Sequence, residues 1–167
     1  AWIAGALTHG AGWSDAVICA QVAQGGDPQA LNELALALSP SSERRAETLG
    51  QGRAFAATVQ EVWGCDVPDA AYPVAVGATI AALDLPFLDA LRLYLQAFSA
   101  NLTSAGVRLI PLGQTDGQRL TAALMPLCAA QAEAALSATL DEIGTFSPAL
   151  DIASQRHETL YSRIFRS

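Results

Sequence analysis

Lysine is absent from this chain of 167 residues, and all nine of its basic residues are arginines. Without lysine, the chain has neither the phosphate-loop lysine of nucleotide hydrolases nor a Schiff-base lysine or other lysine nucleophile. Basic charge is scarce overall, because 16 acidic residues leave a net charge of −7. Since basic side chains that neutralise phosphates supply most of the affinity for nucleic acid, we expect no nucleic acid partner.

Cysteine is also sparse, and the three copies, Cys19, Cys65 and Cys128, follow no disulfide or metal-binding spacing. An odd, scattered set is typical of reduced thiols, so we expect a cytoplasmic protein. No secretory signal pattern is seen in the sequence. The longest apolar run, residues 74–83, is about half as long as a membrane-spanning helix requires. We therefore expect no membrane partner.

Alanine and leucine dominate what is present, with 34 and 22 copies. Both are among the best helix formers, whereas the β-branched and aromatic residues that favour strands are comparatively few. Hydrophobic residues make up 51% of the chain, enough for a sizeable core. The composition predicts an all-α fold, a single-domain irregular bundle of about seven or more helices. We assign the bundle to residues 1–150 and a partner-binding tail to residues 151–167.

Capping residues and helix breakers divide the chain into expected helices. These helices cover residues 14–24, 28–38, 43–63, 72–84, 86–109 and a segment from about 115 to 140. Ser14 and Asp15 offer the cap of the first helix, Asp27 followed by Pro28 starts the second, and Gly64 closes the third. Gly50 and Gly52 lie inside the third helix, which suggests close approach of another helix there, with a kink as the alternative. Pro126 should kink or break the last one.

Candidate catalytic residues are few. His9 and His157 lie at opposite ends of the sequence, and no His-Glu-x-x-His or Cys-x-x-Cys pattern is present. One alternative to a binding protein is a helical metal-dependent or small-molecule-binding enzyme, with a site assembled from His9, Cys65 and His157. Another is a helical transcription regulator with an arginine-rich tail, which the acidity of the chain disfavours.

A polar turn separates the last two long helices, and it consists of Gly113, Gln114, Thr115, Asp116 and Gly117. It lacks the Gly-Lys-Ser/Thr ending of a phosphate-binding loop. The pattern therefore predicts a helix-capping turn in which Thr115 or Asp116 supplies the cap.

The tail is the most unusual segment. If residues 151–167 form one helix, an arc of about 140° holds four of its large apolar or aromatic side chains and one histidine. These are Leu160, Ile164, His157, Tyr161 and Phe165. Arg156 and Arg163 lie together outside that arc. Because a chain end is normally polar and frayed, this pattern indicates docking, either on its own domain or on a second protein with acidic groups. Without a partner, we expect the tail to be disordered or folded onto a neighbour.

Three stretches of this sequence resemble the UreF family of urease accessory proteins. They are YPVAVG at 72–77, PLGQTDGQ at 111–118, and the tail, above all ASQRHE at 153–158 and SRIFRS at 162–167. Residues 2–15 and 47–54 are also similar, so the resemblance extends nearly end to end. The family usually carries a further N-terminal segment, and we expect this chain to be an N-terminally shortened member.

The resemblance implies an all-α homodimer without catalysis or a tightly bound cofactor. UreF-like proteins bridge UreD, also called UreH, and the GTPase UreG, in the complex that delivers nickel to apo-urease during GTP-dependent maturation. Nickel is then transported cargo, with no holding site in this chain. The family's tail becomes ordered on binding UreD and is needed for it. By matching positions, the UreD-facing residues are Ser154, Arg156, His157, Glu158, Tyr161, Arg163 and Phe165. The turn at residues 113–117 is a partner-binding or capping turn.

Overall fold

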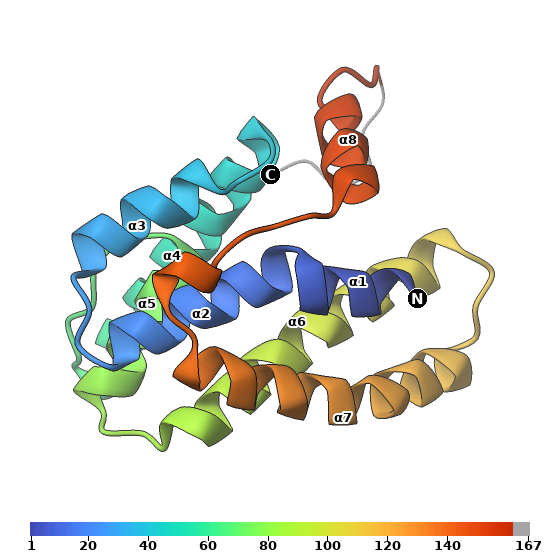
Figure 1. The fold of residues 1–167 in the computed structure, drawn as a ribbon. Helices are drawn as coiled ribbons and strands as arrows, with labels where there is room; N and C mark the ends of the chain where they lie inside the picture. Colours follow the sequence, from blue (N-terminus) through green and yellow to red (C-terminus); the bar gives the residue numbers. More distant parts are fainter. Residues whose placement is uncertain (162–167) are drawn as a thin grey trace.

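The structure, a computed structural model, describes residues 1–161 and consists of helices joined by short loops (Figure 1). The α-helices are α1 (Trp2–His9), α2 (Ala11–Ala23), α3 (Pro28–Ala37), α4 (Ser42–Trp63), α5 (Tyr72–Ala82), α6 (Phe87–Leu109), α7 (Gln114–Ser137) and α8 (Pro148–His157). A short 3-10 helix, η1 (Leu140–Glu142), follows α7. The described part of the chain contains no β strand, and the predicted all-α fold of seven or more helices is confirmed.

Helix α2 forms the centre of the core. Nine of its 13 residues are buried, and α1, α3, α5, α6 and α7 all pack against it (Figure 1). Its apolar residues lie on all sides of the helix, and such a helix is stable only when neighbours surround it, which explains this central position. The long helices α6 and α7 form an antiparallel pair that extends beyond the core.

Two glycines allow close contact between backbones. A Cβ atom at Gly77 in α5 would lie 2.6 Å from the carbonyl oxygen of Cys19, so α5 packs directly on α2. A Cβ at Gly52 in α4 would collide with the carbonyl oxygen of Ala70 and lie 2.9 Å from the nitrogen of Tyr72. The predicted close approach therefore exists at Gly52, although the neighbour is the loop that enters α5. Gly50 faces open space, so the prediction is wrong there.

Several helix ends differ from the predicted ones. Residues 2–9 form α1 and α2 starts at Ala11, because the extended backbone of Gly10 interrupts the helix and Ser14 does not act as a cap. The Ser14 hydroxyl instead donates to the carbonyl of Ala11 within α2. Helix α7 begins after Gly113 without a side-chain cap and continues past Pro126, so neither the predicted cap nor a break at the proline is found.

The segment after α7 runs back across α2 and α1 before α8 begins (Figure 1). Side chains of α2 hold its first part, because the Gln21 amide donates to the carbonyl of Ala138 at 2.8 Å and the Trp13 indole donates to the carbonyl of Glu142 at 3.1 Å. The carbonyl of His9 then accepts hydrogen bonds from the backbone of Phe146 and the hydroxyl of Ser147. Helix α8 therefore starts from a point anchored at the end of α1.

Helix α7 is long and apolar enough to cross a membrane by length and composition, with a mean hydropathy of 1.2. The expectation of no membrane partner considered only unbroken apolar runs. In the structure α7 contributes Leu124, Cys128, Ala132 and Ala135 to the core. Packed core helices meet the same criteria of length and composition, and the absence of a membrane partner stays a prediction.

Candidate functional site

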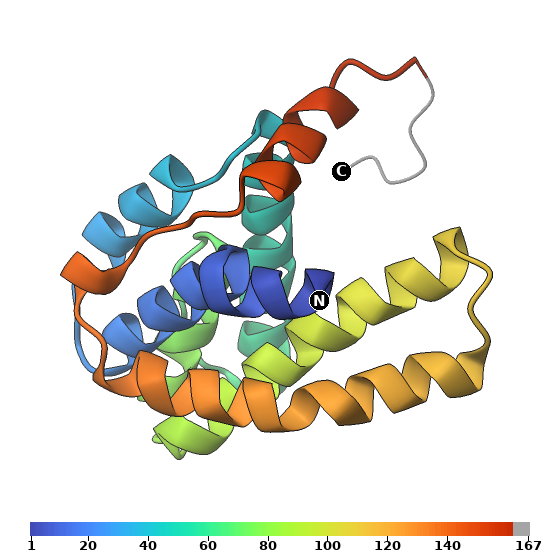
Figure 2. The same ribbon diagram turned by 45° about the vertical axis from the view of Figure 1, so that its right-hand side comes forward.

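The tail helix α8 packs against the beginning of α4, away from the α6–α7 pair (Figure 2). It spans Pro148–His157, so it starts before the predicted tail boundary and ends well before residue 167. Leu160 and Tyr161 lie beyond its last turn. The expected single apolar arc that joins them to His157 is therefore not formed. Arg163 and Phe165 lie outside the described residues.

Glu158 supplies the main contact between the tail and α4. Its Oε1 accepts hydrogen bonds from the backbone nitrogen of Ser42 at 2.6 Å, the Ser42 hydroxyl at 2.6 Å and the backbone nitrogen of Glu43 at 3.2 Å. The first amides of a helix have no partner within the helix and carry partial positive charge, which favours a carboxylate there. The hydrogen bonds from the Ser42 hydroxyl and the nearby backbone amides lower the pKa of Glu158 from its ordinary value.

Three further polar contacts join the tail to residues 40–43. The hydroxyls of Ser154 and Ser41 lie 2.6 Å apart, and Nδ1 of His157 lies 2.6 Å from Oε2 of Glu43. The Gln155 amide donates to the carbonyl of Pro40 at 3.1 Å. The expectation that a partnerless tail is disordered or folded onto a neighbour is therefore wrong through residue 158. These polar groups find complementary groups on their own domain.

The opposite side of the tail faces solvent. No residue of α8 is buried, and Ile152, Leu160 and Tyr161 are exposed apolar or aromatic side chains. Arg156 is exposed as well. The structure thus separates the predicted partner-facing residues into two groups. His157 and Glu158 contact the first turn of α4 and Ser154 contacts its cap residue Ser41, whereas Arg156 and Tyr161 face solvent.

The turn between α6 and α7 lies at the far end of the helix pair. Its first four residues, Gly113, Gln114, Thr115 and Asp116, are exposed. Gly117 is buried, and a Cβ there would lie 2.8 Å from a methyl carbon of Val107, so glycine lets α7 pack closely on the end of α6. Large apolar side chains are exposed around this turn: Leu109, Ile110, Leu112 and Leu120.

A cavity of about 320 Å³ lies between α8 and the bundle. Its apolar walls include Trp2, Phe98, Leu102 and Leu150. Its polar wall consists of side chains from α2 and α4, namely Asp15, Arg44, Glu47 and Gln51. Helix α8 lines part of the cavity, so the position of the tail determines how far this space is closed.

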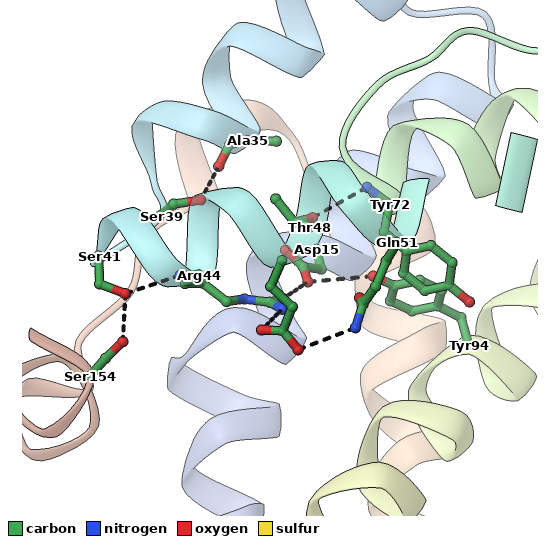
Figure 3. Close-up of polar contacts among 11 residues, drawn as sticks. Asp15, Ala35, Ser39, Ser41, Arg44, Thr48, Gln51, Tyr72, Tyr94 and Ser154 are labelled. Carbon is green, nitrogen blue, oxygen red and sulfur yellow. Dashed lines mark hydrogen bonds and ion pairs between the residues drawn. The ribbon is translucent and has the colours of Figure 1, made fainter. Parts of the chain in front are cut away.

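A partly buried ionic network forms the polar wall (Figure 3). The Arg44 guanidinium lies 2.9 Å from Asp15 and 3.1 Å from Glu47, and the Tyr94 hydroxyl lies 3.4 Å from the same oxygen of Asp15. Burial raises the pKa of Asp15, although Arg44 opposes this shift. Burial alone would lower the pKa of Arg44, but the carboxylates of Asp15 and Glu47 outweigh it and raise that pKa. The network ties the start of α4 to the core.

Sequence reasoning missed this network. The available signal was Asp15 itself, an acidic residue within the apolar segment 11–23, where a charge requires a partner. Beside Ser14, however, Asp15 fits the pattern of a helix cap, and a cap needs no distant arginine.

The alternative enzyme site is not assembled. His157 lies at the beginning of α4 and Cys65 follows its end, so the 22 residues of α4 separate them by about 30 Å. His9 anchors the residue before α8, whereas His157 ends that helix, about 15 Å further on. Among residues 1–161, no group of three or more His, Cys, Asp or Glu side chains is placed to hold a metal ion.

Comparison with known proteins gives a consistent result. Residues 1–125 match the family model UreF. A Cereibacter sphaeroides protein named urease accessory protein UreF is 50% identical over 166 residues, which cover 99% of this chain and 79% of that protein. Proteins of the same name from Ruegeria pomeroyi and Rhodopseudomonas palustris are each 45% identical, covering 100% and 99% of this chain and 78% and 76% of their own lengths.

Proposed function

Because this chain belongs to the UreF family of urease accessory proteins, we propose that it acts as an adaptor joining UreD, also called UreH, to the GTPase UreG. The complex inserts nickel into apo-urease in a GTP-dependent step. The adaptor itself performs no catalysis and holds no resident cofactor, and nickel passes through the complex as cargo. We place this activity in the cytoplasm.

The observation that carries this proposal is the exposed apolar side of the tail. Ile152, Leu160 and Tyr161 project from a segment that has no buried residue of its own. Exposed apolar side chains close to charged ones are typical of a surface that binds another protein. Arg156, beside them, is suited to the acidic groups of UreD.

The turn at residues 113–117 offers a second contact surface, at the end of the α6–α7 pair. Four large apolar side chains are exposed around it: Leu109, Ile110, Leu112 and Leu120. We assign this surface to the expected homodimer.

The test compares two exposed aromatic side chains in a binding assay. Tyr161→Ala should weaken retention of purified UreD by about tenfold or more, because aromatic anchors at interfaces carry much of the binding energy. Because Tyr161 is fully exposed, the variant should keep its helix content and melting temperature. Surface plasmon resonance gives the dissociation constants.

Phe146→Ala is the matched control, because Phe146 is also a highly exposed aromatic residue but lies before α8. It should bind UreD as the unmodified chain does. Equal binding by all three proteins would remove the tail from the contact. Failure of the unmodified chain to retain either UreD or UreG would overturn the adaptor function.

A further inference from the structure

The cavity beside α8 has no role in the contacts proposed for UreD and UreG. Its volume of about 320 Å³ lies at the lower end of the range that is typical of small-molecule sites. Its charged and aromatic side chains, Asp151 excepted, belong to helices α1, α2, α4, α5 and α6. The bundle itself therefore supplies the groups that a ligand would meet, whatever position the tail takes.

The charged groups of the cavity wall favour a cation. Asp15 and Glu47 supply two carboxylates, and among the described residues of the wall Arg44 alone is positively charged. Both terminal nitrogens of Arg44 are already paired, one with Asp15 at 2.9 Å and the other with Glu47 at 3.1 Å (Figure 3). An anion would therefore meet an engaged guanidinium beside two carboxylates, whereas a cation would meet a net negative charge.

Acceptor groups for an ammonium lie on the same wall. Glu47 accepts one hydrogen bond at each carboxylate oxygen, from Arg44 at Oε2 and from the Gln51 amide at Oε1. An ionised carboxylate accepts about four hydrogen bonds, so Glu47 keeps capacity for a ligand. The Gln51 amide nitrogen is directed at Glu47, which leaves its carbonyl oxygen as a further acceptor. A primary ammonium, which carries three donors, matches this set of acceptors.

The remaining walls suit the apolar part of such a ligand. Trp2, Phe98 and Leu102 line the cavity. Trp2 is 61% exposed although it forms part of the wall, so a ligand would cover apolar surface that water now contacts. Aromatic faces also attract cations, and that of tryptophan does so most strongly. The walls therefore favour an apolar or aromatic body attached to the ammonium.

We propose that this cavity binds a small organic cation, namely a primary ammonium on an apolar body. Glu47 and Gln51 accept hydrogen bonds from the ammonium. Asp15, whose side chain is 14% exposed against 43% for Glu47, adds negative charge deeper in the wall. Trp2 and Phe98 contact the apolar body. The site goes beyond the adaptor function, and its binding assay contains no partner protein.

The first test varies the head group of the probe. Isothermal titration calorimetry on the full chain compares 2-phenylethylammonium with 2-phenylethanol and 3-phenylpropionate, which carry a phenyl body and a neutral or anionic head. The ammonium should bind at least about tenfold more tightly than the alcohol, because only the ammonium makes charge-assisted hydrogen bonds to the carboxylates. The anion should bind more weakly still. Equal affinities for the ammonium and the alcohol, or no binding of the ammonium, overturn the proposal.

The second test compares two tryptophans of equal exposure. Trp2 and Trp63 are each 61% exposed, but Trp63 ends α4 and does not line the cavity. Because both side chains lie mostly in solvent, both alanine variants should keep the helix content of the unmodified chain. Trp2→Ala should weaken binding of 2-phenylethylammonium by about tenfold through loss of apolar and cation–π contact, and Trp63→Ala should not. Equal losses in the two variants, or no loss in either, overturn the assignment of the site.

The third test changes the charge of the wall. Glu47→Gln keeps the shape of the side chain but removes its charge, and it should weaken binding of 2-phenylethylammonium by about tenfold. Glu61→Gln, at an exposed position of the same helix outside the cavity, should leave the affinity unchanged. Asn101→Lys places a positive charge at an exposed wall position of α6 without altering the ionic network, and it should also weaken binding. Unchanged affinity in both Glu47→Gln and Asn101→Lys contradicts recognition of a cation.

The outcomes separate this site from the adaptor function. A chain that retains UreD and UreG but binds no 2-phenylethylammonium overturns the cation site and leaves the adaptor function standing. A chain that binds the ammonium with the expected dependence on Trp2 and Glu47, but retains neither partner, overturns the adaptor function and supports the site.

Discussion

Helices α2 and α8 are attached to the molecule by different forces. Nine residues of α2 are buried, and Val17, Ile18 and Cys19 have no exposed surface at all. Helix α8 has no buried residue and is held by hydrogen bonds to residues 40–43. The position of α2 therefore depends on apolar burial, which responds little to acid or salt, whereas that of α8 depends on polar groups that water can solvate.

This difference assigns separate tasks to the two regions. A core helix held by apolar packing gives the bundle one stable arrangement. A surface helix held by polar contacts can leave its position at low cost, as elements that exchange partners commonly do. A protein whose work is contact with other proteins requires both properties.

The largest effect on stability is expected in the buried helix α2. A matched pair of isoleucines, one in α2 and one in α8, tests it. Ile18→Ala should lower the free energy of unfolding by about 2–5 kcal/mol, because it leaves a cavity at a site with 0% exposure. Ile152→Ala, at a side chain 49% exposed in α8, should change it by about 0.5 kcal/mol or less. Urea denaturation followed by circular dichroism measures both. Similar losses in the two variants would show that α8 is packed as firmly as α2.

A middle-sized effect concerns the ionic network that connects α2 to α4. Asp15→Asn should cost about 2 kcal/mol, because among residues 1–161 it leaves the partly buried Arg44 guanidinium with Glu47 as its one ion-pair partner. Asp69→Asn, which removes the exposed partner of Arg53, should cost about 0.5 kcal/mol or less. Thermal unfolding of the two variants side by side gives the comparison. If Asp15→Asn lowers the stability as little as Asp69→Asn does, the Asp15 carboxylate is solvated by water in the folded protein.

The smallest effect on overall stability is expected for titration of Glu158. Its pKa is lowered in the docked tail, so the carboxylate stabilises docking above its ordinary pKa of 4.5, and this contribution is lost as the pH falls through the lowered value. The amide resonances of Ser42 and Glu43 should therefore shift with a midpoint below pH 4.5 in a nuclear magnetic resonance titration. Glu158→Gln should abolish this transition. A midpoint at 4.5 or above would mean that the carboxylate is not bonded to α4.

Much of the fold could be predicted from local patterns. Asp27 followed by Pro28 predicted the start of α3, and the Asp27 side chain does accept from the nitrogen of Gln29. Gly64 was expected to close α4, and it adopts the left-handed conformation that ends the helix. Such signals act within a few residues, so they can be seen without knowing the neighbours in space.

The wrong predictions concern Asp15 and the tail, whose contacts are made with residues far away in the sequence. Ser14 and Asp15 form an ordinary capping pattern. In the structure Asp15 instead lies within α2, where it pairs with Arg44 of α4. The tail pattern was interpreted as one continuous amphipathic helix, whereas docking of Glu158 on α4 engages the chain one residue after the helix ends. In both cases a charged group contacts a residue at least 29 positions away.

The amino-acid sequence by itself determined the helical class, most helix boundaries and the resemblance to an accessory family, because propensity, capping and family motifs are properties of neighbouring residues. Only the tertiary structure decided which side of the tail is available. It brings the start of α4, with its cap residue Ser41, to Ser154, His157 and Glu158, and leaves Tyr161 in solvent. The physical reason is that a hydrogen bond depends on where two groups meet in space, and their separation along the chain does not set that distance.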